Sequence, residues 1–168
     1  MKDKQMKTAY HFVGETLRDG RPVPADGEWL EHDGKIIMCE AGLHASLHPF
    51  DALKYAPANI LCLVEIEGDI QEQTDKVVCR RRRIIKRIDS TKLLQDYARW
   101  CALQVTHLWN APEDVVQYLT LGDESLRAAA RDAATAAAMA AAGDARAAAW
   151  DAQKEHFLEL VNAAFGEI

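Results

Sequence analysis

The sequence lacks the features that would reveal a location or an activity directly. No apolar run approaches the roughly 20 residues that a membrane-spanning helix needs. Residues 1–7 are polar and no apolar segment follows them, so no signal peptide is predicted. The G-x-G-x-x-G, Walker and G-x-S-x-G motifs of dinucleotide-binding proteins, nucleotidases and hydrolases are also absent. We therefore expect a protein of the cytoplasm, without a membrane partner and without a serine-hydrolase triad.

Metal-ligating patterns are scarce as well. The four cysteines are far apart and none forms a C-x-x-C pair, which disfavours a zinc or redox site. Three of the four lie in apolar runs, which predicts buried free thiols. His44 and His48 have the spacing of metal ligands on a helix, but Pro49 follows immediately and no H-E-x-x-H motif is present. We expect no metal site.

The 168 residues carry a net charge of −6, and this charge is spread unevenly. Residues 1–88 hold 14 basic and 14 acidic side chains, whereas residues 89–168 hold 6 basic and 12 acidic ones. Binding to a nucleic-acid backbone needs clustered Lys and Arg. The acidic second half therefore argues against a nucleic-acid partner.

The first half has the pattern of strands and turns, and we predict a sheet domain over residues 1–88. The run 60–66 is almost entirely apolar, which is typical of a strand covered on both faces. Pro49 suits the first turn of a short helix. Strands are predicted at residues 8–13, 29–32, 35–39, 60–66, 76–79 and 84–88, and the helix at residues 49–55.

The second half, residues 89–168, is predicted to be helical almost throughout. Gly122 should end one helix, and residues 127–152 contain 16 alanines, the residue with the highest helix propensity. A turn near Gly143 would fold this alanine-rich run into a hairpin. Its small faces would suit that hairpin or a homodimer seam equally well. The fold class is therefore α+β, a small mixed or antiparallel sheet domain followed by an alanine-rich helical bundle.

A dense basic cluster interrupts the strand pattern between residues 79 and 84. In an extended strand, alternate side chains point to opposite faces, and four arginines cannot all be buried. We therefore expect an edge strand or a loop here, able to contact a phosphate, a nucleotide or an acidic protein surface. The cluster consists of Arg80, Arg81, Arg82 and Arg83.

The first half contains Cys39 followed by Gly42-Leu43-His44-Ala45, then Pro49-x-Asp51-Ala-Leu-x-Tyr55, then Val64-Glu65 and Gly68. With these motifs, residues 10–89 resemble an uncharacterised domain family found in phages and prophages. The resemblance implies a mobile-element origin and brings no established activity. Ser46, which follows the first motif, and Tyr55 are candidate ligand or partner contacts.

The same stretch is also similar to the ADP-ribosyltransferase core. The similarity implies that His11 orients the nicotinamide ribose, that His44 stands where the family has an aromatic residue, and that Glu65 is the available acid. NAD would then be the cofactor. Arginines occupy the strand where that family carries its catalytic glutamate.

Because this catalytic set is incomplete, the favoured function is a non-enzymatic binding protein encoded by a phage or prophage. By analogy, the expected partner is a host protein such as a defence complex. Two alternatives stay open: an NAD-dependent ADP-ribosyltransferase, and a nucleotide- or phosphate-binding module that uses the arginine cluster.

Overall fold

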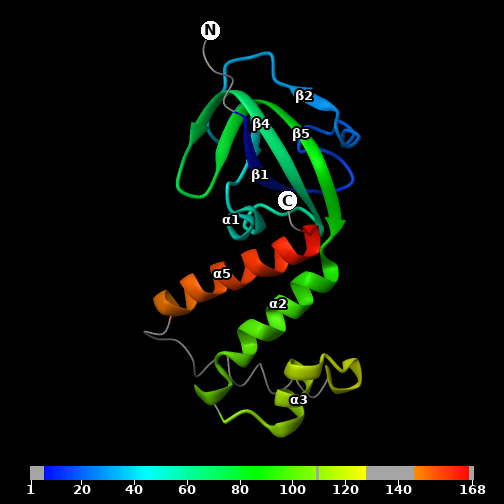
Figure 1. Ribbon diagram of the computed structural model, residues 1–168, viewed down its shortest axis with the longest axis vertical. Helices are drawn as coiled ribbons and strands as arrows, with labels where there is room; N and C mark the ends of the chain where they lie inside the picture. Colours follow the sequence, from blue (N-terminus) through cyan, green and yellow to red (C-terminus); the bar gives the residue numbers. More distant parts are fainter. Residues whose placement is uncertain (1–5, 109, 128–145, 167–168) are drawn as a thin grey trace. The chain divides into compact units, whose positions relative to one another are not determined.

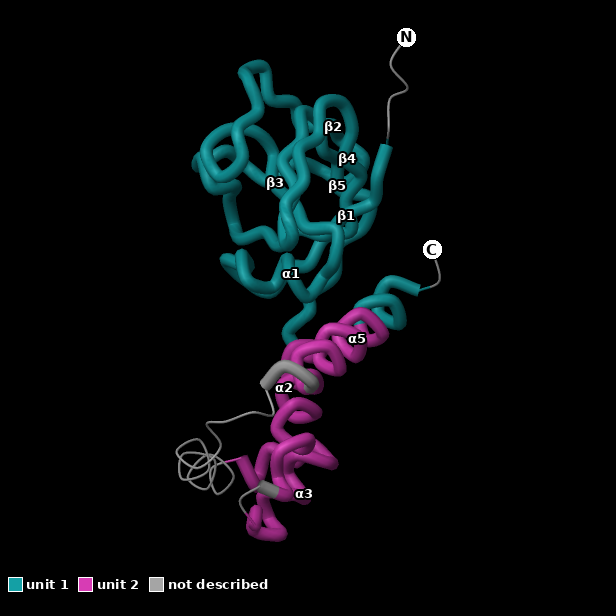
Figure 2. The backbone as a smooth tube through the Cα atoms, turned by 90° about the vertical axis from the view of Figure 1, so that its left-hand side faces the viewer, with its two compact units in different colours: residues 1–91, 161–168 teal, residues 92–160 magenta. Residues whose placement is uncertain are grey.

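The computed structural model describes residues 6–108, 110–127 and 146–166. The chain divides into two compact units, Met1–Thr91 with Val161–Ile168, and Lys92–Leu160 (Figure 2). The strands all belong to the first unit and form one antiparallel sheet, and helices follow the sheet along the chain. The predicted α+β class is confirmed.

The sheet is built around a long hairpin of β4 (Ile60–Glu72) and β5 (Val77–Asp89) (Figure 1). β1 (Lys7–Val13) pairs with β4. Along its other edge, β5 pairs with β2 (Trp29–Glu31) at residues 81–83 and with β3 (Leu43–Ala45) at residues 77–79. β5 is therefore an interior strand with partners on both sides.

The sheet also closes on itself through the residue that follows β3. The Tyr10 N–H donates to the Ser46 carbonyl at 2.8 Å, and the Ser46 N–H donates to the Tyr10 carbonyl at 2.9 Å. The pairing thus runs from β1 through β4, β5 and β3 and back to β1. A bulge in β4 near Gly68, whose φ is +86°, supplies part of the bending that such closure needs.

The closed strands surround an apolar core. Apolar side chains from all four strands contribute, and most are less than a tenth exposed: Ala9, Val13, Leu43, Ala45, Cys62, Val64, Ile66, Val77, Cys79 and Ile84. The alternate residues Leu61 and Leu63 of β4 are buried too. The prediction that residues 60–66 form a strand covered on both faces is confirmed. On the outer side, α1 (Pro49–Leu53) packs against β1, with Pro49 in its first turn as predicted.

Three local predictions were wrong. Residues 35–39 form a turn rather than a return strand, because Ile37 and Ala41 exchange backbone hydrogen bonds and Cys39 adopts a φ of 69°. The predicted strands 76–79 and 84–88 are one continuous strand, β5. Its arginines therefore lie in an interior strand, neither in a loop nor in an edge strand.

The second unit contains α2 (Thr91–Leu103) from Lys92 onward, η1 (Thr106–Leu108), α3 (Glu113–Leu121), η2 (Glu124–Leu126) and the first part of α5 (Arg146–Phe165). α3 ends at Gly122 as predicted, in a left-handed conformation with φ of 69°. Tyr97 and Phe157 meet edge to face with ring centroids 4.8 Å apart. Trp100 stacks on His156 at 4.1 Å.

Most of the alanine-rich run, residues 128–145, lies outside the described residues, and so does the hairpin predicted there. The remainder of the run is helical from Arg146 onward. In the described part of the chain, no helix is both long and apolar enough to cross a bilayer.

The turn before β3 generates a stability prediction. Gly42 has a φ of +116°, and a Cβ there would lie 2.5 Å from Cγ2 of Val78. Gly20 also has a positive φ, +83°, but a Cβ there would meet no atom within 4 Å. We expect Gly42→Ala to cost about 1–2 kcal/mol of unfolding free energy for the backbone plus about 1–3 kcal/mol for the steric clash.

Gly20→Ala is the matched control and should show only the backbone cost. Urea unfolding of both variants measures the difference. Equal losses would mean that the close approach of Gly42 to β5 contributes nothing to stability.

Candidate functional site

Arg81 and Arg83 lie on the outer face of the sheet, where they flank one aromatic side chain. Their guanidinium carbons are 4.6 and 4.7 Å from the ring centroid of Trp29. Arg83 binds Glu65, with its Nε 2.6 Å from Oε2, and Arg81 binds Glu67. Both arginines therefore already have carboxylate partners from β4, the neighbouring strand.

Arg80 is also engaged within the chain. Its Nε and Nη2 contact Oδ2 of Asp69 at 3.1 and 3.0 Å. Its Nη1 donates to the carbonyls of His32 and Gly34 at 3.2 and 3.0 Å. The Arg80 side chain thereby anchors the loop after β2. Its charge is paired with a carboxylate, so no uncompensated charge is left in β5.

Arg82 differs from its three neighbours because it is buried and has no carboxylate partner. Its side chain belongs to the core side of β5, and the residue is 7% exposed. It donates to the carbonyl oxygen of His44. Among the described residues no carboxylate pairs with it, whereas ion pairs link Arg80, Arg81, Arg83 and Arg87 to Asp69, Glu67, Glu65 and Asp26.

The unbonded N–H groups of Arg82 are not sealed inside the protein. In the described part of the chain, the one buried side-chain nitrogen that lacks a hydrogen bond belongs to Arg81. The Nε and Nη2 groups of Arg82 make no hydrogen bond to a described residue, so they retain contact with solvent. They are the N–H donors of Arg82 that no described residue uses.

His11 lies beside Arg82. Burial, the charge of Arg82 and the nearby His44 hold the pKa of His11 well below its usual value, so the ring is neutral at pH 7. No described residue hydrogen-bonds this ring, and the side chain is partly exposed. His11 is therefore a second polar group that remains available next to Arg82.

His44, in contrast, is used by the fold. Its Nε2 accepts a hydrogen bond from the Cys39 N–H at 3.0 Å. Burial is the main cause that lowers the pKa of His44, and the charges of Arg82, Arg18 and Lys76 lower it further. The neutral ring thus fixes the turn at residues 39–44.

The three residues suggested by the transferase resemblance do not all meet. His11 and His44 both lie near Arg82. Glu65 lies between the buried Val64 and Ile66 in β4, so its side chain points to the opposite face of the sheet. There it is bound by Arg83.

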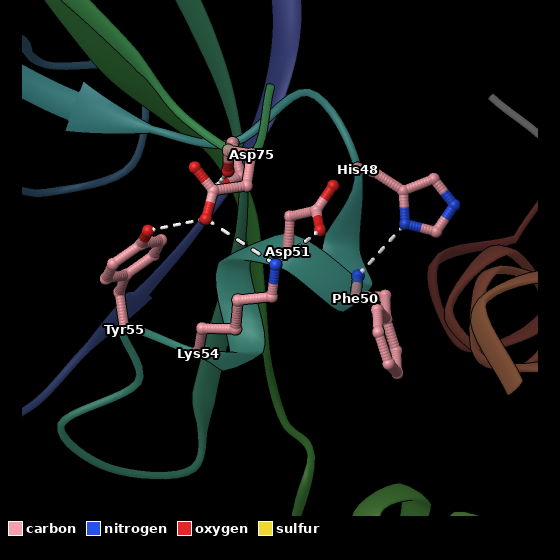
Figure 3. A network of polar contacts seen from close by, with 7 residues as sticks. His48, Phe50, Asp51, Lys54, Tyr55 and Asp75 are labelled. Carbon is pink, nitrogen blue, oxygen red and sulfur yellow. Dashed lines mark hydrogen bonds and ion pairs between the residues drawn. The ribbon is translucent and has the colours of Figure 1, made fainter. Parts of the chain in front are cut away.

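Ser46 and Tyr55 do lie close together, and both contact the turn between β4 and β5. The Ser46 hydroxyl donates to the Asp75 carbonyl at 2.8 Å, and the Tyr55 hydroxyl donates to Oδ2 of Asp75 at 2.7 Å. Lys54 bridges Asp51 and Asp75 in the same network (Figure 3). These contacts fasten α1 and the strand β3 to the turn.

The cysteines and the possible metal ligands among the described residues do not form a second candidate site. All four cysteines are free; Cys62 and Cys79 are buried as predicted, whereas Cys39 is exposed. Burial raises the pKa of both buried thiols to about 11. Among the described residues, no three His, Cys, Asp or Glu side chains lie close enough together to hold a metal ion.

Sequence reasoning missed two residues near the arginine cluster. Trp29 was recognised only as part of a short strand, because its contact with Arg81 and Arg83 depends on the register of β2 on β5. Arg18 lies in the loop before β2, and its proximity to His44 has no signal in the sequence. Both depend on contacts between residues that are distant along the chain.

A family described as a domain of unknown function (DUF7666) matches residues 7–96, just over half of the chain. The matched region contains the whole sheet. This match confirms the prediction that the chain carries an uncharacterised domain. It supports neither the phage association nor the likeness to transferases. No curated protein and no solved structure matches the chain.

The neutral state of His11 generates a pH prediction. Its pKa is lowered in the folded protein and close to 6.5 in the unfolded chain. Between these values the unfolded chain binds more protons, so the free energy of unfolding should fall as the pH drops from about 7 to 5. One histidine contributes a slope no steeper than about 1.4 kcal/mol per pH unit.

His11→Asn should make this pH dependence shallower, with part of it retained because the pKa of His44 is lowered too. Urea unfolding at pH 7, 6 and 5 measures the slope, and His107→Asn in the second unit is the control. An unchanged slope in His11→Asn would show that His11 does not titrate as its surroundings imply.

Proposed function

The chain belongs to the DUF7666 family of unknown function, and we propose that its sheet unit is a non-enzymatic binding module for an anionic ligand. Arg82 is the principal contact of the proposed site, and His11 lies beside it. The observation that carries the proposal is the contrast within β5. Arg82 is buried without a carboxylate among the described residues, while the arginines on either side each have one.

The energetic argument starts from desolvation. Removing a charged group from water costs several kcal/mol even after the protein relaxes. One hydrogen bond involving a charged group returns only about 1.5–3 kcal/mol. Arg82 makes one such bond, to the His44 carbonyl. An anion bound to its remaining N–H groups would offset the rest of the cost.

The surroundings of Arg82 favour an anion over a cation. His11 and His44 are the titratable rings beside it, and both have lowered pKa values. Cys62 and Cys79 are neutral at pH 7 because burial raises the pKa of each thiol to about 11. A ligand with a negative group would therefore enter an environment with no competing negative charge among these neighbours.

Apart from Glu65, which lies on the face opposite to His11 and His44, this geometry does not test the other functional predictions. A phage or prophage origin, a host-protein partner such as a defence complex, and a cytoplasmic location stay predictions. NAD-dependent ADP-ribosyl transfer also stays a prediction. Its cofactor carries a pyrophosphate of the proposed ligand class, so NAD belongs among the ligands to be tested.

Thermal unfolding of the full chain with inorganic phosphate, ADP-ribose, NAD or acetate at constant ionic strength tests the proposal. A ligand at 100 times its dissociation constant should add about 2.7 kcal/mol of stability. Arg82→Met should abolish this gain while keeping the side-chain volume. Arg83→Met, in the same strand but paired with Glu65 in the parent protein, should retain it.

Circular dichroism first establishes that Arg82→Met is folded. If it is not, His11→Asn replaces it and should reduce the anion-dependent gain. The proposal is wrong if no anion stabilises the parent protein, or if Arg83→Met loses the gain while Arg82→Met keeps it. Stabilisation by NAD alone would instead favour the transferase alternative.

A further inference from the structure

One edge of the Arg82 guanidinium is unused by the fold. The side chain donates through Nη1 to the His44 carbonyl. In a planar guanidinium, Nη1 lies on the same side as Cδ, so the N–H groups of Nε and Nη2 share the opposite edge and point the same way. Neither of these two nitrogens bonds to a described residue, and both retain contact with solvent. Arg82 therefore presents a complete pair of parallel donors.

Other arginines of the sheet unit use this same edge to bind a carboxylate. In four described arginines, Nε and Nη2 both contact a single carboxylate oxygen, at distances between 2.5 and 3.1 Å. The pairs are Arg21 with Asp19, Arg80 with Asp69, Arg83 with Glu65, and Arg87 with Asp26. Arg82 presents the same edge without a described acid in front of it. A carboxylate is therefore the group that this edge accepts elsewhere in the protein.

The side chains that flank Arg82 across the sheet are apolar. Arg82 lies directly opposite Ile66 of β4 and Leu30 of β2, and opposite residues of antiparallel strands share a face. Ile66 belongs to the apolar core, and Leu30 packs against that core. Ile84, two residues further along β5, is 3% exposed. These side chains offer no hydrogen bond to a ligand, but they can cover its carbon atoms.

The number of oxygens distinguishes a carboxylate from a phosphate at this position. A carboxylate has two oxygens, which the N–H groups of Nε and Nη2 can both satisfy, and its third substituent is carbon. A phosphate has further oxygens that need donors or water, and a neutral His11 offers a single N–H. Phosphate oxygens left against Ile66 and Leu30 would cost free energy because they lose water without gaining a hydrogen bond.

We infer that the Arg82 site binds a carboxylate attached to an apolar group, with Nε and Nη2 holding the oxygens while Leu30 and Ile66 flank the carbon atoms. This inference rests on the proposed anion-binding function and names the class of its ligand. A free aliphatic acid and the C-terminus of a peptide share this chemistry. Hexanoate represents the first source, and N-acetylleucine represents the second.

The experiment is isothermal titration calorimetry of the full chain at pH 7 and constant ionic strength. The ligands are hexanoate, N-acetylleucine, acetate, hexanamide and inorganic phosphate. Each CH₂ group that leaves water tightens binding about fourfold, so the preferred larger acid should bind about tenfold or more tightly than acetate and phosphate. Hexanamide has nearly the shape of hexanoate without its charge and should not bind. The tighter of the two larger acids identifies the source of the carboxylate.

Arg82→Lys keeps the positive charge but removes the pair of parallel donors, so it should weaken binding of the preferred acid about tenfold or more. Arg83→Lys is the matched control, because the same edge of Arg83 already holds Glu65, and it should bind like the parent protein. Leu30→Ala should reduce the preference for the larger acid over acetate and leave acetate binding unchanged. This variant also tests the inference if circular dichroism shows that Arg82→Lys is unfolded.

The two proposals fail in different ways. If inorganic phosphate binds as tightly as the acids and its binding depends on Arg82, the anion site stands and the carboxylate assignment is wrong. Equal binding of hexanamide and hexanoate, or an unchanged affinity for the acids in Arg82→Lys, would also overturn the assignment. If no anion binds with a dependence on Arg82, the proposed function itself is wrong.

Discussion

The structure depends on how an interior strand accommodates four consecutive arginines. In β5 the backbone N–H and C=O groups pair with β4 on one edge and with β2 or β3 on the other. Arg81 and Arg83 project from the outer face, where Glu67 and Glu65 of β4 lie directly opposite them. Their stems cover Trp29. Charge pairing across neighbouring strands makes a basic interior strand compatible with a closed sheet.

The same alternation that pairs the outer arginines places Arg82 on the core side. A buried guanidinium without an acid is uncommon, because desolvation of the charge must be offset by other contacts. The fold supplies one such contact, the carbonyl of His44. Ionisable groups in a desolvating environment are often found at functional sites. The buried position of this charge is therefore the physical basis for assigning a ligand site to the sheet unit.

The apolar periodicity of the sequence was sufficient to predict β1, the first half of β4, the helix at Pro49 and the end of α3. The alternation of side chains along a strand predicted that Arg81 and Arg83 share one face and that Arg82 lies on the other. The interior place of β5 could not be predicted, because the acids that neutralise Arg80, Arg81 and Arg83 come from β4 and β2 and become neighbours only through strand pairing. The turn at residues 35–39 was missed for a similar reason, since the long-range pairing of β3 sets it. Arg82 and His11 were both candidates from the sequence, but their proximity follows from the closure of the sheet.

The central claim is that Arg82 holds an anion while its neighbours hold carboxylates of the chain. The most direct measurement is an NMR titration that follows the arginine Nε–Hε signals as inorganic phosphate is added at constant ionic strength. The account predicts a saturable shift of the Arg82 signal, with the Arg83 signal unchanged because Glu65 already binds that side chain. An Arg82 signal that does not move while phosphate is added, or one that moves no more than the Arg83 signal, would contradict it.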